Sequence, residues 1–444
     1  MDDESNVESD ADGTADSPDR DTQLQAWTWI PTLYFASGLP YFAVASLATV
    51  MYANLGVSNA DNAAYTSDML WPWALKPFWS PLVDVLGTQR RWIVATQAVI
   101  AAALAGVALA IPAGNFFVLT VAGFWLLAIA SATHDIAADG YYMSSMPERD
   151  QAWFVGIRST FYRMSYFFSS GALVWLVGEL TVNGEGDISF AKAWGWIFAG
   201  IAGLFLFLSV YHQFLLPRPE EAADKRDRTA SETWADFIDT FPSFFRKPGI
   251  GMAIAYLLIY RFSEAQLIKL KAPFLLDTRE NGGLALTNQQ LGVLDGLVGV
   301  GLLTVGGIIG GIVVANGSLR RWLFPMALAI NLPNAAYAYL AWAQPDTLPP
   351  VAVAIAFEQF GYGFGFAGYM LYMLQLSRGD HQTAHYAICT GFMALSMIIP
   401  GRFAGALQEW LGYEKFFYWV LAAVVPSLII TLLAPIRETK ADEG

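Results

Sequence analysis

Three ionisable residues, His134, Asp135 and Asp139, interrupt the long apolar run from Trp125 to Met143. The two aspartates are four residues apart, so in a helix their carboxylates project from nearly the same face. Ionisable groups are costly inside a bilayer and usually mark an ion or substrate pathway. We therefore predict that Asp135 and Asp139 carry or relay a proton, and that His134 contributes to a substrate site beside them. The alternative is that the two aspartates are helix-dipole or salt-bridge residues near a membrane end.

A second charged set lies in the apolar segment at 249–276. Arg261 and Glu264 are three residues apart and could pair within one helix. Alternatively, the guanidinium of Arg261 binds a substrate carboxylate or phosphate through two parallel hydrogen bonds, and Glu264 belongs to the same substrate site. Lys269 and Lys271 lie near the expected outer end of the segment, from which long side chains can reach the membrane interface.

Glu358 lies deep in another apolar segment. A buried carboxylate needs either a basic partner or a proton, and we expect Arg261 or Arg402 as the partner. Glu358 is therefore a further candidate for proton coupling. His381 and His385 have a spacing that could suit a metal, but no third or fourth ligand is evident, so a surface or capping role is favoured.

The composition is that of a polytopic membrane protein. The 444 residues are 55% hydrophobic and 14% charged, with a mean hydropathy of +0.41, whereas soluble proteins have about 25% charged residues. The one cysteine, Cys389, excludes an internal disulfide and a cysteine-based metal site. The sequence has no phosphate-binding loop, nucleophile elbow or dinucleotide fingerprint. We expect no cofactor, no metal, no nucleic-acid partner and no enzymatic activity.

The apolar residues fall into twelve segments, each long enough to cross about 30 Å of hydrocarbon as a helix. They cover residues 27–53, 62–86, 91–111, 115–143, 150–178, 192–216, 249–276, 288–315, 320–342, 350–377, 380–409 and 413–435. The predicted fold is an all-α integral membrane protein of twelve transmembrane helices, in two six-helix bundles at 27–216 and 249–436. Residues 1–26 and 437–444 are expected to be tails, the first of them disordered. Residues 217–248 are expected to form a linker with an amphipathic helix.

Lysine and arginine residues are distributed unevenly between the two sides of this topology. Fifteen fall on the side of the amino terminus, whereas three, Lys192, Arg279 and Lys415, fall on the other side. Positive charge is retained on the cytoplasmic side of a membrane. Both termini, the 1–26 and 437–444 tails and the linker are therefore predicted to be cytoplasmic, in a chain that we expect to be a monomer.

The pattern G-x-x-R-R-W occurs at Gly87–Trp92 and again at Gly317–Trp322. Each copy follows the second segment of its half. This arrangement is typical of two parallel six-helix repeats, as in the major facilitator superfamily.

The first copy also resembles the signature loop of that superfamily. Asp84, Gly87, Arg90 and Arg91 match the signature, and two other positions depart from it. The resemblance implies that these four residues form a conformational latch. The alternative for the two arginines is that their charges only set the topology.

Several motifs resemble those of the AmpG-type muropeptide permeases. They are FASGLP at 35–40, KPFWSPLVD at 76–84, SATHDIAAD at 131–139, YRM at 162–164, FEQFGYGFG at 357–365, and HYA at 385–387 with GRFAG at 401–405. These motifs occur in both halves of the chain. The resemblance implies proton-driven import of anhydro-muropeptides across the inner membrane.

By this resemblance, Asp135 and Asp139 correspond to a pair of aspartates in the fourth helix of the permeases. Arg163 and Arg402 lie on matched motifs and are expected to line the substrate cavity. The permeases have Gln at the position of His134, and the segment around Arg261 is richer in charge than theirs. A different sugar or organic anion is therefore an alternative substrate, and a membrane-embedded transferase is the alternative from another class.

Overall fold

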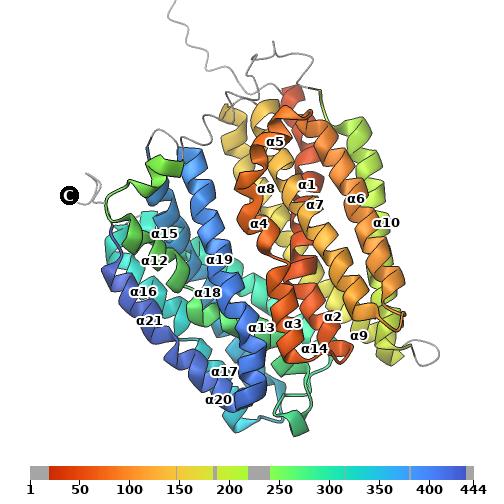
Figure 1. The fold of residues 1–444 in the computed structure, drawn as a ribbon, viewed down its shortest axis with the longest axis vertical. Helices are drawn as coiled ribbons and strands as arrows, with labels where there is room; N and C mark the ends of the chain where they lie inside the picture. Colours follow the sequence, from red (N-terminus) through yellow and green to blue (C-terminus); the bar gives the residue numbers. More distant parts are fainter. Residues whose placement is uncertain are drawn as a thin grey trace, which may run out of the picture.

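The computed structural model describes residues 20–146, 148–183, 188–218, 241–315, 317–379 and 382–436. In these ranges the chain forms helices and the turns between them. Figure 1 shows the helices running side by side, with the first half of the chain (red to yellow-green) next to the second half (green to blue). The predicted tail at 437–444, His381 and most of 1–26 and 217–248 lie outside the described residues.

The first half contains long helices together with several short helical elements. Its elements are α1 (Arg20–Phe42), η1 (Ala43–Leu47), α2 (Ala48–Asn54), α3 (Asn59–Asp68), α4 (Trp71–Leu75), η2 (Lys76–Phe78), α5 (Ser80–Val85), α6 (Gln89–Ala110), α7 (Phe116–Ser145), α8 (Glu148–Tyr166), η3 (Phe167–Leu173), α9 (Val174–Asn183) and α10 (Phe190–Leu215). Since α1 begins at Arg20, the helix extends about two turns beyond the apolar run into the region that we predicted to be a tail.

The second half likewise combines long helices with short helical elements. Its elements are α12 (Ile250–Ile259), α13 (Phe262–Leu276), η5 (Arg279–Asn281), α14 (Asn288–Leu291), η6 (Gly292–Gly299), α15 (Val300–Ala315), α16 (Leu319–Asn331), α17 (Asn334–Ala343), α18 (Leu348–Ser377), α19 (Gln382–Leu411), α20 (Tyr413–Ala422) and α21 (Val424–Leu433). The elements η1, η3 and η6 are π-helical, a geometry that is frequent at functional sites.

Among the described residues, seven helices are long and apolar enough to cross a membrane. They are Leu24–Asn54, Gln89–Ala110, Phe116–Ser145, Phe190–Leu215, Asn288–Val314, Ala384–Leu411 and Tyr413–Leu433. Each coincides with one of the predicted segments. In its described part the chain is thus all-helical, and it has the long apolar helices that are typical of a membrane protein.

Three other predicted segments, at 62–86, 249–276 and 320–342, are broken into shorter helices. Prolines stand at the breaks of 62–86 and 320–342, because proline lacks the amide N–H that continues a helix and restricts the residue before it. In 249–276 the break falls at Arg261, where α12 ends and α13 begins. Irregular backbone at membrane depth is tolerated only where protein or water surrounds it.

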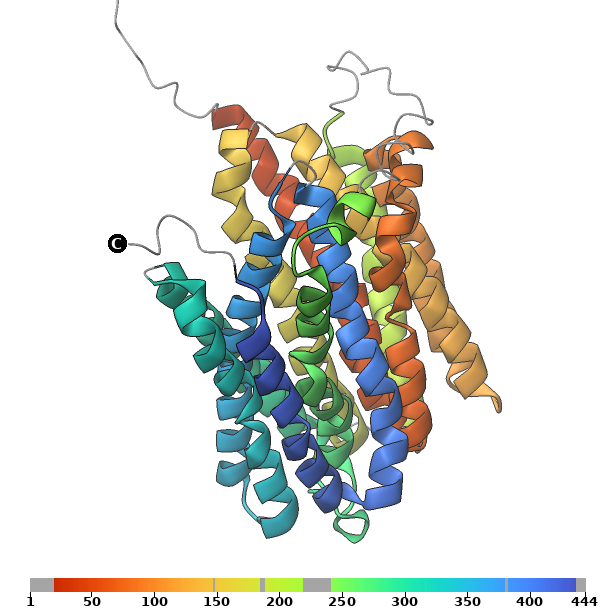
Figure 2. The same ribbon diagram turned by 60° about the vertical axis from the view of Figure 1, so that its left-hand side comes forward.

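The two ends of the molecule differ. The start of α1 and the turns at 86–88 and 317–318 lie at one end, which we call the amino-terminal end; the turns at 55–58 and 344–347 lie at the other, which we call the closed end. Figure 2 shows α19 and α13 lying in front of the first-half helices in the turned view. At the closed end, α3 packs along α19, η3 packs against η6, and α2 packs against α13.

Specific contacts hold the halves together at the closed end. The side-chain amide of Asn59 donates to Gln408 and to the hydroxyl of Tyr413, both at 2.8 Å. A Cβ added to Gly296 in η6 would lie 2.1 Å from Cα of Gly171 in η3, so the two backbones touch directly. This end of the molecule is therefore shut.

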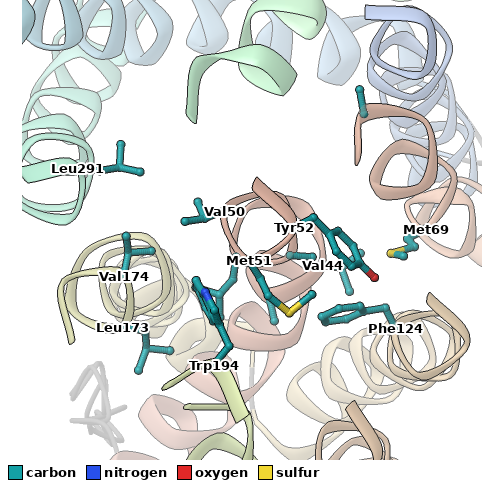
Figure 3. Close-up of a cluster of buried hydrophobic side chains, with 14 of the residues drawn as sticks. Val44, Val50, Met51, Tyr52, Met69, Phe124, Leu173, Val174, Trp194 and Leu291 are labelled. Carbon is teal, nitrogen blue, oxygen red and sulfur yellow. The ribbon is translucent and has the colours of Figure 1, made fainter. Parts of the chain in front are cut away.

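A hydrophobic cluster lies next to this contact. Figure 3 shows Tyr52 close to Phe124, and Leu291 of the second half beside Val174 of the first. These side chains are at most 2% exposed. Burial of apolar surface thus supports the helices that carry the contact between the halves.

Candidate functional site

A cavity of about 320 Å³ lies among α1, η2, α7 and α8. It is lined by Tyr34, Ser37, Lys76, Asp135, Asp139, Arg158, Ser159, Tyr162 and Arg163. Along α7, the exposed fraction of the side chain rises from 13% at Asp135 to 48% at Asp139, which lies one turn nearer to the amino-terminal end. The cavity is therefore reached from the amino-terminal end and shut off from the closed end.

Asp139 is held by two neighbours in the cavity wall. Arg158 of α8 donates to its Oδ1 at 2.9 Å, and the hydroxyl of Tyr34 in α1 donates to the same oxygen at 3.1 Å. The guanidinium of Arg158 also stacks on the ring of Tyr34, 4.5 Å from its centroid. A charged substrate group that enters here competes with the Arg158–Asp139 pair.

Asp135 has a different and looser partner. Its Oδ2 lies 4.0 Å from Nζ of Lys76 in η2. Asp135 and Asp139 thus line one cavity, as their spacing predicts. Each carboxylate faces a different cation. Lys76 and Arg158 were not among the predicted site residues, although a Lys or Arg inside an apolar segment is a signal that could have identified them.

Arg163, one turn and a half along α8 from Arg158, lines the same cavity as expected. Its guanidinium reaches the second half, where it lies 3.7 Å from the position that a Cβ of Gly307 would occupy. Its side chain is exposed. A guanidinium in this place can bind a substrate carboxylate through two hydrogen bonds.

His134 does not line the cavity; it lies behind the cavity wall and is fully buried. Its Nδ1 is 3.2 Å from the hydroxyl of Ser37, and its Nε2 is 3.0 Å from the amide of Gln97. The other end of that amide is 3.0 Å from Nδ1 of His212, whose Nε2 is 3.0 Å from the hydroxyl of Thr32. His134 therefore reaches the cavity only through Ser37, which lines it.

Arg261 and Glu264 pair with each other, which was the first of the two readings of their spacing. Two nitrogens of Arg261 donate to the two carboxylate oxygens of Glu264, at 2.6 and 2.7 Å, and a third contact joins Arg261 to the hydroxyl of Tyr362 at 3.1 Å. Both charged side chains are almost fully buried. Neither residue lines the cavity, and the fork of the guanidinium is already filled by Glu264.

Glu358 has a partner other than the two arginines that we expected. Nζ of Lys271 lies 3.1 Å from Oε2 of Glu358 and 2.6 Å from Oδ1 of Asp295. Lys271 therefore does not extend to the membrane interface. Lys269 is also buried and donates to the hydroxyl of Thr66 in the first half, at 3.1 Å. The position of these lysines near the end of the apolar segment could not show that both side chains turn toward the protein interior.

Arg402 lies at the closed end, away from the cavity that it was predicted to line. It forms an ion pair with Asp68 at the end of α3. This contact joins the two halves. The arginine thus contributes to the closure of that end.

The latch residues lie around the turn between α5 and α6. Nε of Arg90 donates to the carbonyl of Leu216 at 3.2 Å, and the guanidinium also contacts the carbonyl of Gln213. These carbonyls belong to the end of α10, where a cation is favoured. Asp84 is the residue before the last one of α5, Gly87 lies in the turn, and Arg91 lies in the first turn of α6. Arg90 thus binds a first-half helix, and the latch role remains a prediction.

The two copies of G-x-x-R-R-W have the same local structure. The hydroxyl of Thr88 accepts from the amide of Arg91 at 3.3 Å, and the hydroxyl of Ser318 accepts from the amide of Arg321 at 3.3 Å. Each hydroxyl therefore caps the start of a helix, α6 or α16. The repeat in the sequence is thus a repeat in structure.

The described residues contain no group of three or more side chains that could hold a metal ion. His385 lies 2.8 Å from the hydroxyl of Ser243, in keeping with the favoured structural role. The described cavity has charged and hydroxyl-bearing walls and faces one end of a membrane protein. Such an arrangement suits the binding and release of a polar solute.

Comparisons with known proteins agree with this arrangement. The anhydromuropeptide permease of Escherichia coli is 24% identical over 90% of this chain and 78% of its own. A protein of Rickettsia conorii named as an AmpG-type transporter is 23% identical, over 90% and 94% of the two chains. The crystal structure of the nucleoside transporter NupG matches with a TM-score of 0.69 at 15% identity, over 93% and 98% of the chains.

These relatives are permeases and transporters, which sets the transferase alternative aside, and they confirm the resemblance to the AmpG-type permeases. The family model described as Major Facilitator Superfamily matches residues 32–401. The chain is thus a transporter that belongs to the Major Facilitator Superfamily.

Proposed function

We propose that this protein is a proton-coupled importer of muropeptide-like solutes, composed of an anhydro-sugar and a peptide, which works by alternating access in the inner membrane. The observation that carries the proposal is the cavity itself. It combines two carboxylates, three cations and several hydroxyl groups, it is reached from one end, and it is shut at the other.

The cavity chemistry fits such a solute. Peptide carboxylates can bind Arg163, and sugar hydroxyls can exchange hydrogen bonds with Ser37, Ser159 and Tyr162. The relatives named as muropeptide permeases support the same substrate class. Coupling uses carboxylates that can take up a proton, with Asp135, Asp139 and Glu358 as the candidates.

The proposal includes twelve spans, both termini in the cytoplasm and a monomer. With that orientation the amino-terminal end is the inner side, and the described conformation faces inward. Single cysteines at Ser231 and Asn115 test it, in a background with Cys389→Ser. We expect labelling from the inside and from the outside respectively, and reversed labelling would contradict the orientation.

Uptake into proteoliposomes tests the substrate and the coupling. We expect labelled anhydro-muropeptide to accumulate under an imposed pH gradient, and excess neutral sugar not to compete with it. Competition by a simple sugar or organic anion that is itself accumulated would assign the transporter to a different solute. An Arg163→Gln variant should bind the peptide-bearing solute at least tenfold more weakly, since it lacks the guanidinium.

A further inference from the structure

An ion cluster in the second half is short of one positive charge. The ammonium of Lys271 in α13 lies 2.6 Å from Oδ1 of Asp295 in η6 and 3.1 Å from Oε2 of Glu358 in α18. These three residues are 6%, 7% and 2% exposed. Two carboxylates face one ammonium, so the cluster carries a net charge of −1 when both are ionised, in a place that water does not reach.

No other described cation balances this charge. Arg261 is bound by Glu264, and Lys269 donates to Thr66. The other titratable groups around the cluster are Tyr337 of α17, whose hydroxyl donates to Glu358 at 3.5 Å, Tyr166 of α8, Tyr362 of α18 and Glu264 of α13. None of the tyrosines brings a positive charge, and Glu264 is already paired with Arg261. An isolated buried charge is strongly unfavourable, so the cluster requires one more cation.

One buried oxygen atom at the cluster also lacks a hydrogen-bond donor, namely Oε1 of Gln359. The amide nitrogen of Gln359 donates to Glu358 at 3.1 Å, which places this side chain in the cluster. Buried polar atoms without partners are rare and call for an explanation. A proton on one of the carboxyl groups would supply a donor here.

We propose that the cluster of Lys271, Asp295, Glu358 and Gln359 binds a coupling proton of its own, besides any proton that the two aspartates of the cavity carry. The proton bonds to a carboxylate oxygen of Asp295 or Glu358, and the net charge of the cluster changes from −1 to zero. The proton is favoured over a sodium ion because the ammonium of Lys271 already occupies the space between the two carboxylates. This inference rests on the proposed function only in calling the proton the coupling ion.

The position of the cluster explains how its charge can control transport. Asp295 lies between Gly292 and Gly296, the two glycines of η6 that touch Gly171 and Trp175 of the first half. When the halves part at the closed end, these contacts are lost and η6 becomes accessible from that side. When they close, the cluster is buried again, and burial of an unbalanced charge opposes the closure. Proton binding therefore favours the conformation described here, and proton loss favours opening of the closed end.

The test measures the conformation directly, without substrate. Spin labels at Asp61 and Lys415 report the distance across the closed end in the full chain with Cys389→Ser. We expect the long-distance population to rise at least fivefold between pH 6 and pH 9. Glu358→Gln and Asp295→Asn each remove the excess negative charge permanently, so both should keep the short distance at both pH values. Glu280→Gln changes an exposed carboxylate near the same end and should respond to pH like the parent.

The outcomes separate the possibilities. A parent-like pH response in both Glu358→Gln and Asp295→Asn would overturn the assignment of the proton to this cluster, as would an absent response in the parent. The same measurement is repeated with choline in place of sodium. If the label distance changes with the sodium concentration and not with pH, the choice of a proton as the bound ion is wrong. Failure of the parent protein to take up muropeptide would contradict the proposed substrate. The distance measurement would still test the cluster, because it is made without substrate.

Discussion

Arg402 forms an ion pair with Asp68, which joins α19 of the second half to α3 of the first half at the closed end. The two side chains are 45% and 22% exposed, so the pair is not buried in the contact between the halves. Exposed pairs contribute about 0.2–1 kcal/mol. We expect Asp68→Asn or Arg402→Gln to raise, by about 1.5- to 5-fold, the population of molecules in which the two halves have parted at the closed end. The distance between spin labels at Asp61 and Lys415 measures this population. Weaker substrate binding with an unchanged conformation would instead restore Arg402 to the predicted substrate site.

The contact between Gly171 and Gly296 gives a stronger test of closure. A Cβ on Gly296 would lie 2.1 Å from Cα of Gly171. Overpacking of this kind costs about 1–3 kcal/mol, so Gly296→Ala should raise the open population by roughly 5- to 150-fold. Gly301→Ala, on the adjoining α15, is the matched control, since nothing lies within 4 Å of its added Cβ. An equal effect of both variants would show that helix propensity, and not the contact, is responsible.

The sequence could predict which residues share a helix face, but not which residues from other helices meet them. The spacing of Asp135 and Asp139 places both on one cavity, because a period of 3.6 residues defines a face. Their partners Lys76 and Arg158 come from η2 and α8. Only the packing of separate helices determines such pairs.

The same limit explains the incorrect expectations in the second half. The depth of Lys271 in its segment suits either a lysine that reaches the interface or one that turns inward. The inward orientation follows from the position of Glu358 and Asp295 on two other helices. Two interpretations of Arg261 were open, namely substrate binding and pairing with Glu264 three residues away. The structure shows the pair. Local spacing was therefore informative where both partners lie on one element.

The pair of Arg261 and Glu264 is expected to stabilise the fold. Either Arg261→Ala or Glu264→Ala leaves one uncompensated buried charge, which costs about 3–5 kcal/mol. The double variant should lose less than the sum of the two, with a coupling of about 0.5–3 kcal/mol, in thermal unfolding in detergent. Arg246→Ala, at an exposed arginine, is the control. If Arg261→Ala is as stable as the parent and binds substrate weakly, the residue is a substrate clamp after all.

The hydrogen-bonded chain through His134 makes a separate prediction. Gln97→Leu removes the partner of one ring nitrogen in His134 and of one in His212. Each buried polar atom that loses its partner costs about 1–3 kcal/mol, so the unfolding temperature should fall clearly. Gln382→Leu, at an exposed position, should leave it unchanged. An unaltered melting temperature in Gln97→Leu would mean that water replaces the amide in the chain.

The last prediction concerns the two aspartates of the cavity. Each faces one cation, Lys76 or Arg158, and a proton on the carboxylate would release that cation toward the substrate. We therefore expect Asp135→Asn and Asp139→Asn to abolish accumulation driven by a pH gradient, while substrate exchange at equal pH continues at a measurable rate.

Ser159→Ala, which removes a hydroxyl from the same wall, is the control and should still accumulate substrate under the gradient. If both asparagine variants also accumulate it like the parent, the aspartates serve as ion-pair partners in the wall of the cavity. Proton coupling would then depend on the cluster around Glu358, in which two carboxylates face one ammonium.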